Sequence, residues 1–96
     1  MLESVGRRLT DGNITSDAVN EVAEEMSLHL AALRNSGEIS NDAFLEAGVI
    51  QGGISVLANM IDTECNSDEL MVHFKQLSDR ANTICQSYPE LSETLA

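Results

Sequence analysis

Aromatic side chains and proline are scarce in this chain of 96 residues. Tryptophan is absent, the only aromatic residues are Phe44, Phe74 and Tyr88, and Pro89 is the single proline. Leucine, isoleucine, valine, methionine and alanine therefore have to fill the hydrophobic core, and these side chains suit the packing of helix on helix. No run of five or more residues alternates between apolar and polar side chains, so the sequence predicts no strand.

The chain also has few cysteines and no long uncharged segment. The two cysteines, Cys65 and Cys85, are too few for a disulfide framework. The longest uncharged segment, residues 47–61, is shorter than the roughly 20 residues that span a membrane, and no secretory signal begins the chain. We therefore expect a cytoplasmic protein of one domain, residues 1–96, that has no membrane partner.

Sequence signatures of catalysis and of metal binding are missing. The chain has no glycine-rich phosphate loop, no Gly-x-Ser-x-Gly turn and no His-Glu-x-x-His motif. His29, His73 and the two cysteines are the only soft metal ligands, and no two of them have the spacing of a zinc site. We expect a protein that is not an enzyme and that uses no metal and no cofactor.

Basic residues are few, and they are far outnumbered by acids. Five Lys and Arg stand against sixteen Asp and Glu, which gives a formal net charge of −11. No base occurs between Arg34 and Lys75, although that stretch contains seven acids. A surface of this charge repels nucleic acid and anionic membranes but attracts basic proteins. The bases form no stripe, so direct binding of nucleic acid is not expected.

Three segments show apolar residues at the three- and four-residue spacing of a helix face. Each begins after a residue that can cap a helix, such as Ser40, and the first stops before Gly37, which suits a left-handed C-terminal position. The fold class is therefore all-α, a small helical bundle of three main helices plus a possible short N-terminal helix, and we expect it to be dimeric. The predicted helices cover residues 16–35, 41–62 and 67–87, with residues 1–15 and 89–96 loosely ordered or in short helices.

The second predicted helix has a wider apolar arc and more glycine than a surface helix needs. Each of its three glycines costs about 1 kcal/mol relative to alanine, so some packing advantage should offset that cost. Three explanations are open: close approach of a second copy across a two-fold axis, tight packing inside one chain, or a kink at adjacent glycines. The candidate residues for dimer or helix packing are Gly48, Val49, Gly52, Gly53, Val56 and Met60.

The leading functional hypothesis is a non-catalytic acidic protein that binds a basic, nucleic-acid-handling partner and inhibits or regulates it. Carboxylates at helical spacing would imitate the phosphates of nucleic acid on a nuclease or a defence complex, as a phage or mobile-element inhibitor would. The candidate contacts are Glu21, Glu24, Glu25, Glu38, Asp42 and Glu46. The alternative is a small helical chaperone or assembly adaptor whose apolar groove takes a partner helix. Its candidate surface is Leu28, Val49, Val56 and Met60.

Overall fold

The computed structural model describes all 96 residues and contains helices but no strand. The elements are α1 (Leu2–Asp11), α2 (Ser16–Asn35), α3 (Asn41–Asp62), α4 (Ser67–Ser87), the 3-10 turn η1 (Pro89–Leu91) and α5 (Ser92–Leu95). The prediction of an all-helical bundle is confirmed, and the bounds of the three long helices coincide with those expected from the sequence. The two end segments, which the sequence left as loosely ordered or helical, form short helices.

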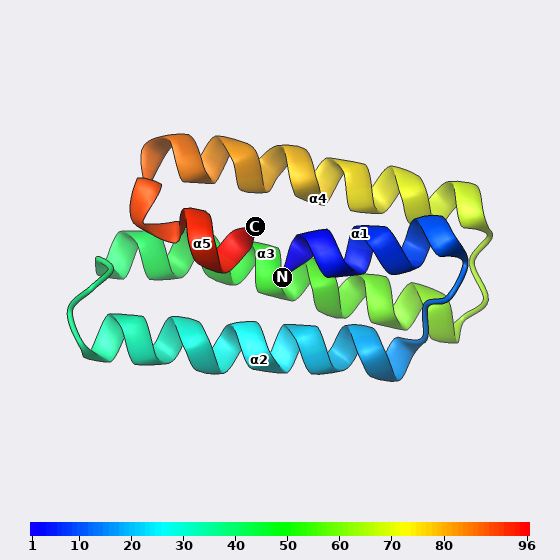
Figure 1. Ribbon diagram of the computed structural model, residues 1–96, viewed down its shortest axis with the longest axis horizontal. Coiled ribbons are helices and arrows are strands. Elements are labelled where there is room, and N and C mark those ends of the chain that lie inside the picture. Colours follow the sequence, from blue (N-terminus) through cyan, green and yellow to red (C-terminus); the bar gives the residue numbers. More distant parts are fainter.

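Consecutive long helices run antiparallel, so that α2 and α4 point in the same direction, and two short helices occupy the fourth position of the bundle (Figure 1). In that position α1 and α5 lie end to end in front of α3, between α4 and α2 (Figure 1). The backbone N–H of Glu3 donates to the carbonyl oxygen of Ala96 at 2.9 Å, so the two short helices meet head to tail. The resulting bundle measures 39 × 23 × 18 Å.

Polar side chains fix where each long helix begins. The side-chain oxygens of Thr15, Ser40 and Asn66 each accept a hydrogen bond from the backbone N–H three residues further on, at 3.2, 3.0 and 2.9 Å. Each such cap stabilises its helix by about 1 kcal/mol because it satisfies a donor that has no partner inside the helix. After α2, Gly37 adopts a left-handed φ of 79°, which turns the chain toward α3.

The hydrophobic core is centred on α3, which packs most closely against α2 and α4. Six of its residues are buried: Ala43, Ala47, Ile50, Ile54, Leu57 and Ala58. Met26 and Leu30 of α2 pack on this row. From the C-terminal segment, Leu91 and Leu95 are 0% and 1% exposed and belong to the same cluster. The C-terminal segment therefore contributes two leucines to the core.

Among the helices, α3 alone has the length and hydropathy of a membrane span, with a mean hydropathy of 1.4 over its most apolar 18 residues. The prediction that no segment spans a membrane used only the uncharged residues 47–61, which are shorter than the complete helix. In the bundle, 28% of that window is buried in protein. The remaining part of the window faces outward and carries no charged residue from residue 47 to residue 61.

Candidate protein-binding surfaces

The outer surface of the first half of α2 carries three of the predicted acids. Glu21, Glu24 and Glu25 are all exposed, and residues three and four apart share one face of a helix. Asp17 extends this face by one turn toward the N-terminus, and Leu28, which is 67% exposed, extends it by one turn in the other direction. We call these five residues the α2 stripe. The helix carries no Lys or Arg before its last turn, where Arg34 lies.

The other three predicted acids, Glu38, Asp42 and Glu46, lie at the opposite end of the bundle. Glu38 is in the connection between α2 and α3, and the other two are in the first turns of α3. Ten residues, or about 15 Å of helix, separate Glu25 from the end of α2. Because α2 and α3 are antiparallel (Figure 1), the six acids form two separate groups of three.

A second set of acids lies near the start of α2, and sequence reasoning did not connect it with the stripe. These are the exposed carboxylates around the connection from α3 to α4, namely Asp62, Glu64, Asp68 and Glu69. Figure 1 shows this connection at the same end of the bundle as the first turns of α2. The antiparallel order of the helices brings the two sets to one end, which is therefore strongly acidic.

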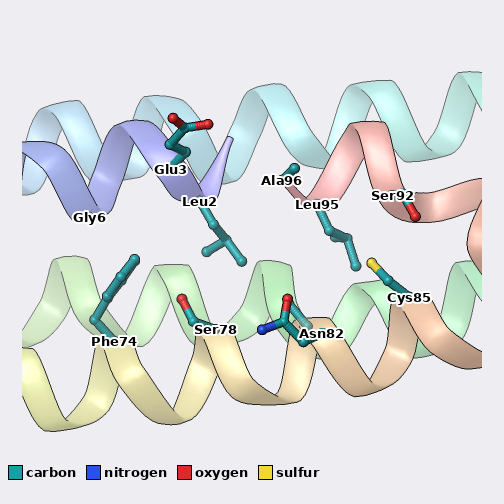
Figure 2. Close-up of a pocket in the computed structure, with 11 residues that line it drawn as sticks. Leu2, Glu3, Gly6, Phe74, Ser78, Asn82, Cys85, Ser92, Leu95 and Ala96 are labelled. Carbon is teal, nitrogen blue, oxygen red and sulfur yellow. The ribbon is translucent and has the colours of Figure 1, made fainter.

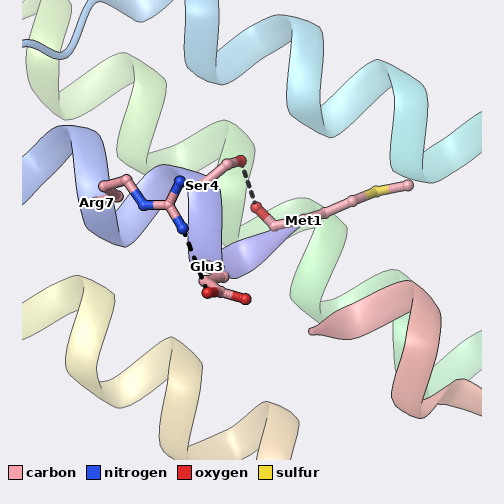
Figure 3. Close-up of polar contacts among 4 residues, drawn as sticks. All are labelled: Met1, Glu3, Ser4 and Arg7. Atoms are coloured by element: carbon pink, nitrogen blue, oxygen red, sulfur yellow. Dashed lines mark hydrogen bonds and ion pairs between the residues drawn. The ribbon is translucent and has the colours of Figure 1, made fainter.

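Few acids are neutralised within the chain. Arg7 contacts Glu3 at 3.4 Å on the exposed side of α1 (Figure 3), and Lys75 contacts Asp79 at 3.7 Å on α4. These are the only ion pairs, so fourteen of the sixteen acids have no basic partner in the chain (16 − 2). Carboxylates of the α2 stripe and of the α3–α4 connection therefore remain available to an external cation.

The three glycines of α3 face different neighbours. A Cβ added at Gly53 would collide with Leu77 of α4, and Nε2 of His73 lies 2.9 Å from the Gly53 carbonyl oxygen, in a hydrogen bond. Tight packing inside one chain therefore accounts for Gly53. At Gly48 and Gly52 an added Cβ would meet nothing within 4 Å beyond the backbone of α3 itself. Contacts within the chain therefore do not explain why Gly48 and Gly52 are glycines.

The outward side of α3 is apolar as well as open. Leu45, Val49 and Val56 are 60%, 44% and 50% exposed, and they share this side of the helix with Gly48 and Gly52. We call these five residues the α3 strip. Two other predicted packing residues, Gly53 and Met60, are half-buried and turn toward α4. There Met60 lines a shallow groove between the two helices, together with Val72, His73, Gln76, Asp68 and Glu69.

A cleft of about 470 Å³ lies where α1 and α5 meet above α4. Figure 2 shows Leu2, Leu95 and Phe74 around it, with the sulfur of Cys85 directed toward the α5 side. Ser78 and Asn82 supply its polar groups, while the carboxylate of Glu3 points away from it (Figure 2). The cleft is bordered by the ends of the two short helices, Leu2 of α1 and Leu95 of α5, and by the facing side of α4.

The soft metal ligands are dispersed. Cys65 and Cys85 are free and half-buried, His29 is exposed, and His73 is occupied by its bond to α3. No group of three or more His, Cys, Asp or Glu side chains is placed to hold a metal ion. The features that stand out on this molecule are therefore its surfaces, one acidic and one apolar.

Comparisons with protein-family models, with curated proteins and with solved structures find no match to this chain. No family or activity can therefore be transferred to it. The α2 stripe and the α3 strip are the features of the molecule that point to a function.

Proposed function

We propose that this protein binds a basic partner protein through the α2 stripe and thereby inhibits or regulates it. The observation that carries the proposal is the row of exposed carboxylates on α2 that no base of the chain neutralises. Acids placed at helical spacing repel one another, and an external Lys or Arg cluster relieves this repulsion. Binding to a basic partner therefore relieves the repulsion between carboxylates that destabilises the free protein.

The stripe combines charge with an apolar anchor. Its four acids attract and orient a basic surface, since electrostatic complementarity chiefly increases the rate and the specificity of association. Leu28 continues the same face and is 67% exposed, so it offers apolar area that a partner pocket would cover. Interfaces generally depend on a few such buried anchors surrounded by polar contacts.

The charge density of the stripe is close to that of one nucleic acid strand. Its acids extend from residue 17 to residue 25, eight steps of helix or about 12 Å, and carry four negative charges. A strand of duplex DNA carries one phosphate per roughly 3.4 Å, or about four over the same length. This similarity supports a partner whose basic groove ordinarily holds nucleic acid, such as a nuclease, a defence complex or a DNA-binding regulator.

A capture experiment with two matched variants tests the proposal. The bait is the wild-type protein, the triple variant Glu21→Gln, Glu24→Gln, Glu25→Gln, or the triple variant Glu38→Gln, Asp42→Asn, Glu46→Gln, each presented to cell lysate. The two variants lose the same charge at opposite ends of the bundle. We expect a basic nucleic-acid-handling protein to be retained at about 0.05 M salt and released at about 0.5 M. The α2 variant should lose it, and the other variant should keep it.

Equal retention by the two variants would contradict a role for the α2 stripe, because only net charge would then matter. A second step tests the resemblance to nucleic acid. If the captured protein binds duplex DNA and this protein at the same groove, added DNA should release it from the bait. Simultaneous binding of both would rule out imitation of phosphates while leaving the acidic interface intact.

The second candidate function is a helical chaperone or assembly adaptor, favoured by the exposed apolar side chains of the α3 strip. Such a protein would hold an amphipathic helix of its partner against Leu45, Val49 and Val56. One pair of variants separates the two functions. If Val56→Asp abolishes capture of the partner while Glu21→Lys, Glu24→Lys, Glu25→Lys leaves it unchanged, the adaptor function replaces the acidic one.

A further inference from the structure

We infer that the α3 strip is an interface between two copies of this chain, which pack their α3 helices antiparallel about a two-fold axis at Gly52. The strip is open, because an added Cβ at Gly48 or Gly52 meets nothing within 4 Å outside its own helix backbone. It is also apolar, because Leu45, Val49 and Val56 are at least 44% exposed. This proposal concerns a different surface from the acidic stripe and does not depend on it.

The spacing of the strip makes it complementary to itself. Gly48 and Val56 lie four residues before and four residues after Gly52, so a two-fold axis at Gly52 places Val56 opposite the partner's Gly48. The reverse contact follows from the symmetry, as an interface of this type requires. Each valine then enters the space that a glycine leaves open. Rows of residues four apart are the ridges that interlock in the commonest class of helix packing.

Charge favours a second copy over a basic protein as the occupant. α3 has no charged residue between Glu46 and Asp62. At about 100° per residue, Asp42, Glu46 and Asp62 lie about 80°, 120° and 80° around the helix from Gly52. Two strips can therefore meet without opposing their carboxylates, even though each chain carries a charge of −11. A basic partner would find no acid to pair with on this surface.

The area of the strip predicts a weak dimer. The strip runs from Leu45 to Val56, eleven steps of helix or about 17 Å, and a helix is about 10 Å wide, which gives a contact of roughly 170 Å². Stable complexes bury about 800 Å² on each partner. The two copies should therefore exchange rapidly with the monomer and associate mainly at high protein concentration.

Salt should strengthen this association. Two chains of charge −11 repel each other, and added ions screen that repulsion without weakening the apolar contact. Binding of a basic protein to the α2 stripe should respond in the opposite direction. The sign of the salt effect therefore distinguishes failure of this inference from failure of the proposed function.

Sedimentation equilibrium of the purified full chain at rising concentration, at about 0.05 M and about 0.5 M salt, tests the inference. Gly52→Glu places a carboxylate on the two-fold axis, where it meets its own copy. The monomer should tolerate it, because the site is open and glutamate is a better helix former than glycine. Asn20→Glu, at an exposed position of α2, adds the same charge elsewhere.

We expect the wild-type chain and Asn20→Glu to dimerise more tightly in high salt. Gly52→Glu should weaken dimerisation by at least about tenfold, since like charges in contact are strongly unfavourable. Far-UV circular dichroism should show that Gly52→Glu keeps its helices. A wild-type chain that stays monomeric in high salt, or a Gly52→Glu variant that dimerises as the wild type does, would overturn the inference. Binding of neutral phosphatidylcholine vesicles by the wild type but not by Gly52→Glu would assign the strip to a lipid surface instead.

Discussion

Substitution by alanine should stabilise the protein at Gly52 of α3 but destabilise it at the neighbouring Gly53. Alanine is about 1 kcal/mol more favourable than glycine inside a helix. At Gly52 the new methyl group meets nothing outside α3, so Gly52→Ala should raise the free energy of unfolding by about 0.5–1 kcal/mol. The effect belongs to the monomer and should be measured at low protein concentration, where self-association is negligible.

At Gly53 the same methyl group meets α4. It would collide with one terminal carbon of Leu77 and lie 3.5 Å from two further carbons of that side chain. Leu77 is 6% exposed and has little room to move, and the bond from His73 to the Gly53 carbonyl holds the two helices close. Overpacking of this kind costs about 1–3 kcal/mol, so Gly53→Ala should lose more than it gains from helix propensity.

The two variants should therefore differ by about 1–3 kcal/mol in stability, with Gly53→Ala the less stable. Urea unfolding followed by far-UV circular dichroism measures this difference. Thermal unfolding should show it as well, at roughly 4–8 °C per kcal/mol for a domain of this size. Equal stability of Gly52→Ala and Gly53→Ala would refute the close approach of α3 and α4 at Gly53.

Three further substitutions test how individual contacts stabilise the bundle, and each variant is measured by urea unfolding. Leu95→Ala should cost about 2–5 kcal/mol because this side chain is fully buried in the core, and a loss below 1 kcal/mol would place α5 outside the core. Ser40→Ala should cost about 1 kcal/mol by removing the cap of α3, whereas an unchanged stability would mean that the cap bond is not formed in solution. Glu3→Gln should change stability by less than about 0.5 kcal/mol because the ion pair with Arg7 is exposed, and a larger loss would show that the pair holds α1 in place.

The long helices were predictable from the sequence because their signals are local. Apolar spacing indicates the helix face, and a capping residue such as Ser40 fixes the first turn within four residues of chain. The two end segments, residues 1–15 and 89–96, have no such local signals. Leu91 and Leu95 are buried because the last residues fold back onto α2 and α4, and contacts between distant parts of the chain leave no local pattern.

The positions of the candidate residues could be predicted from the sequence only within a single helix. Sequence spacing groups Glu21, Glu24 and Glu25 on one helix face, since that grouping is a property of a single helix. It did not separate them from Glu38, which lies at the other end of the bundle, because the separation follows from the antiparallel path of α2 and α3. The glycines illustrate the same difference. Gly52 and Gly53 are adjacent in sequence, and only the position of α4 decides which of them is packed.

The salt dependence of the affinity for the captured protein would show whether the α2 stripe is the binding surface for a basic partner. Titrations at several salt concentrations would compare the wild-type protein with the two charge-neutralised triple variants. We predict that the affinity of the wild type falls steeply as salt rises, that the α2 variant binds more weakly with a shallower salt dependence, and that the Glu38, Asp42 and Glu46 variant resembles the wild type. The same salt dependence in all three proteins would show that the α2 stripe is not the binding surface.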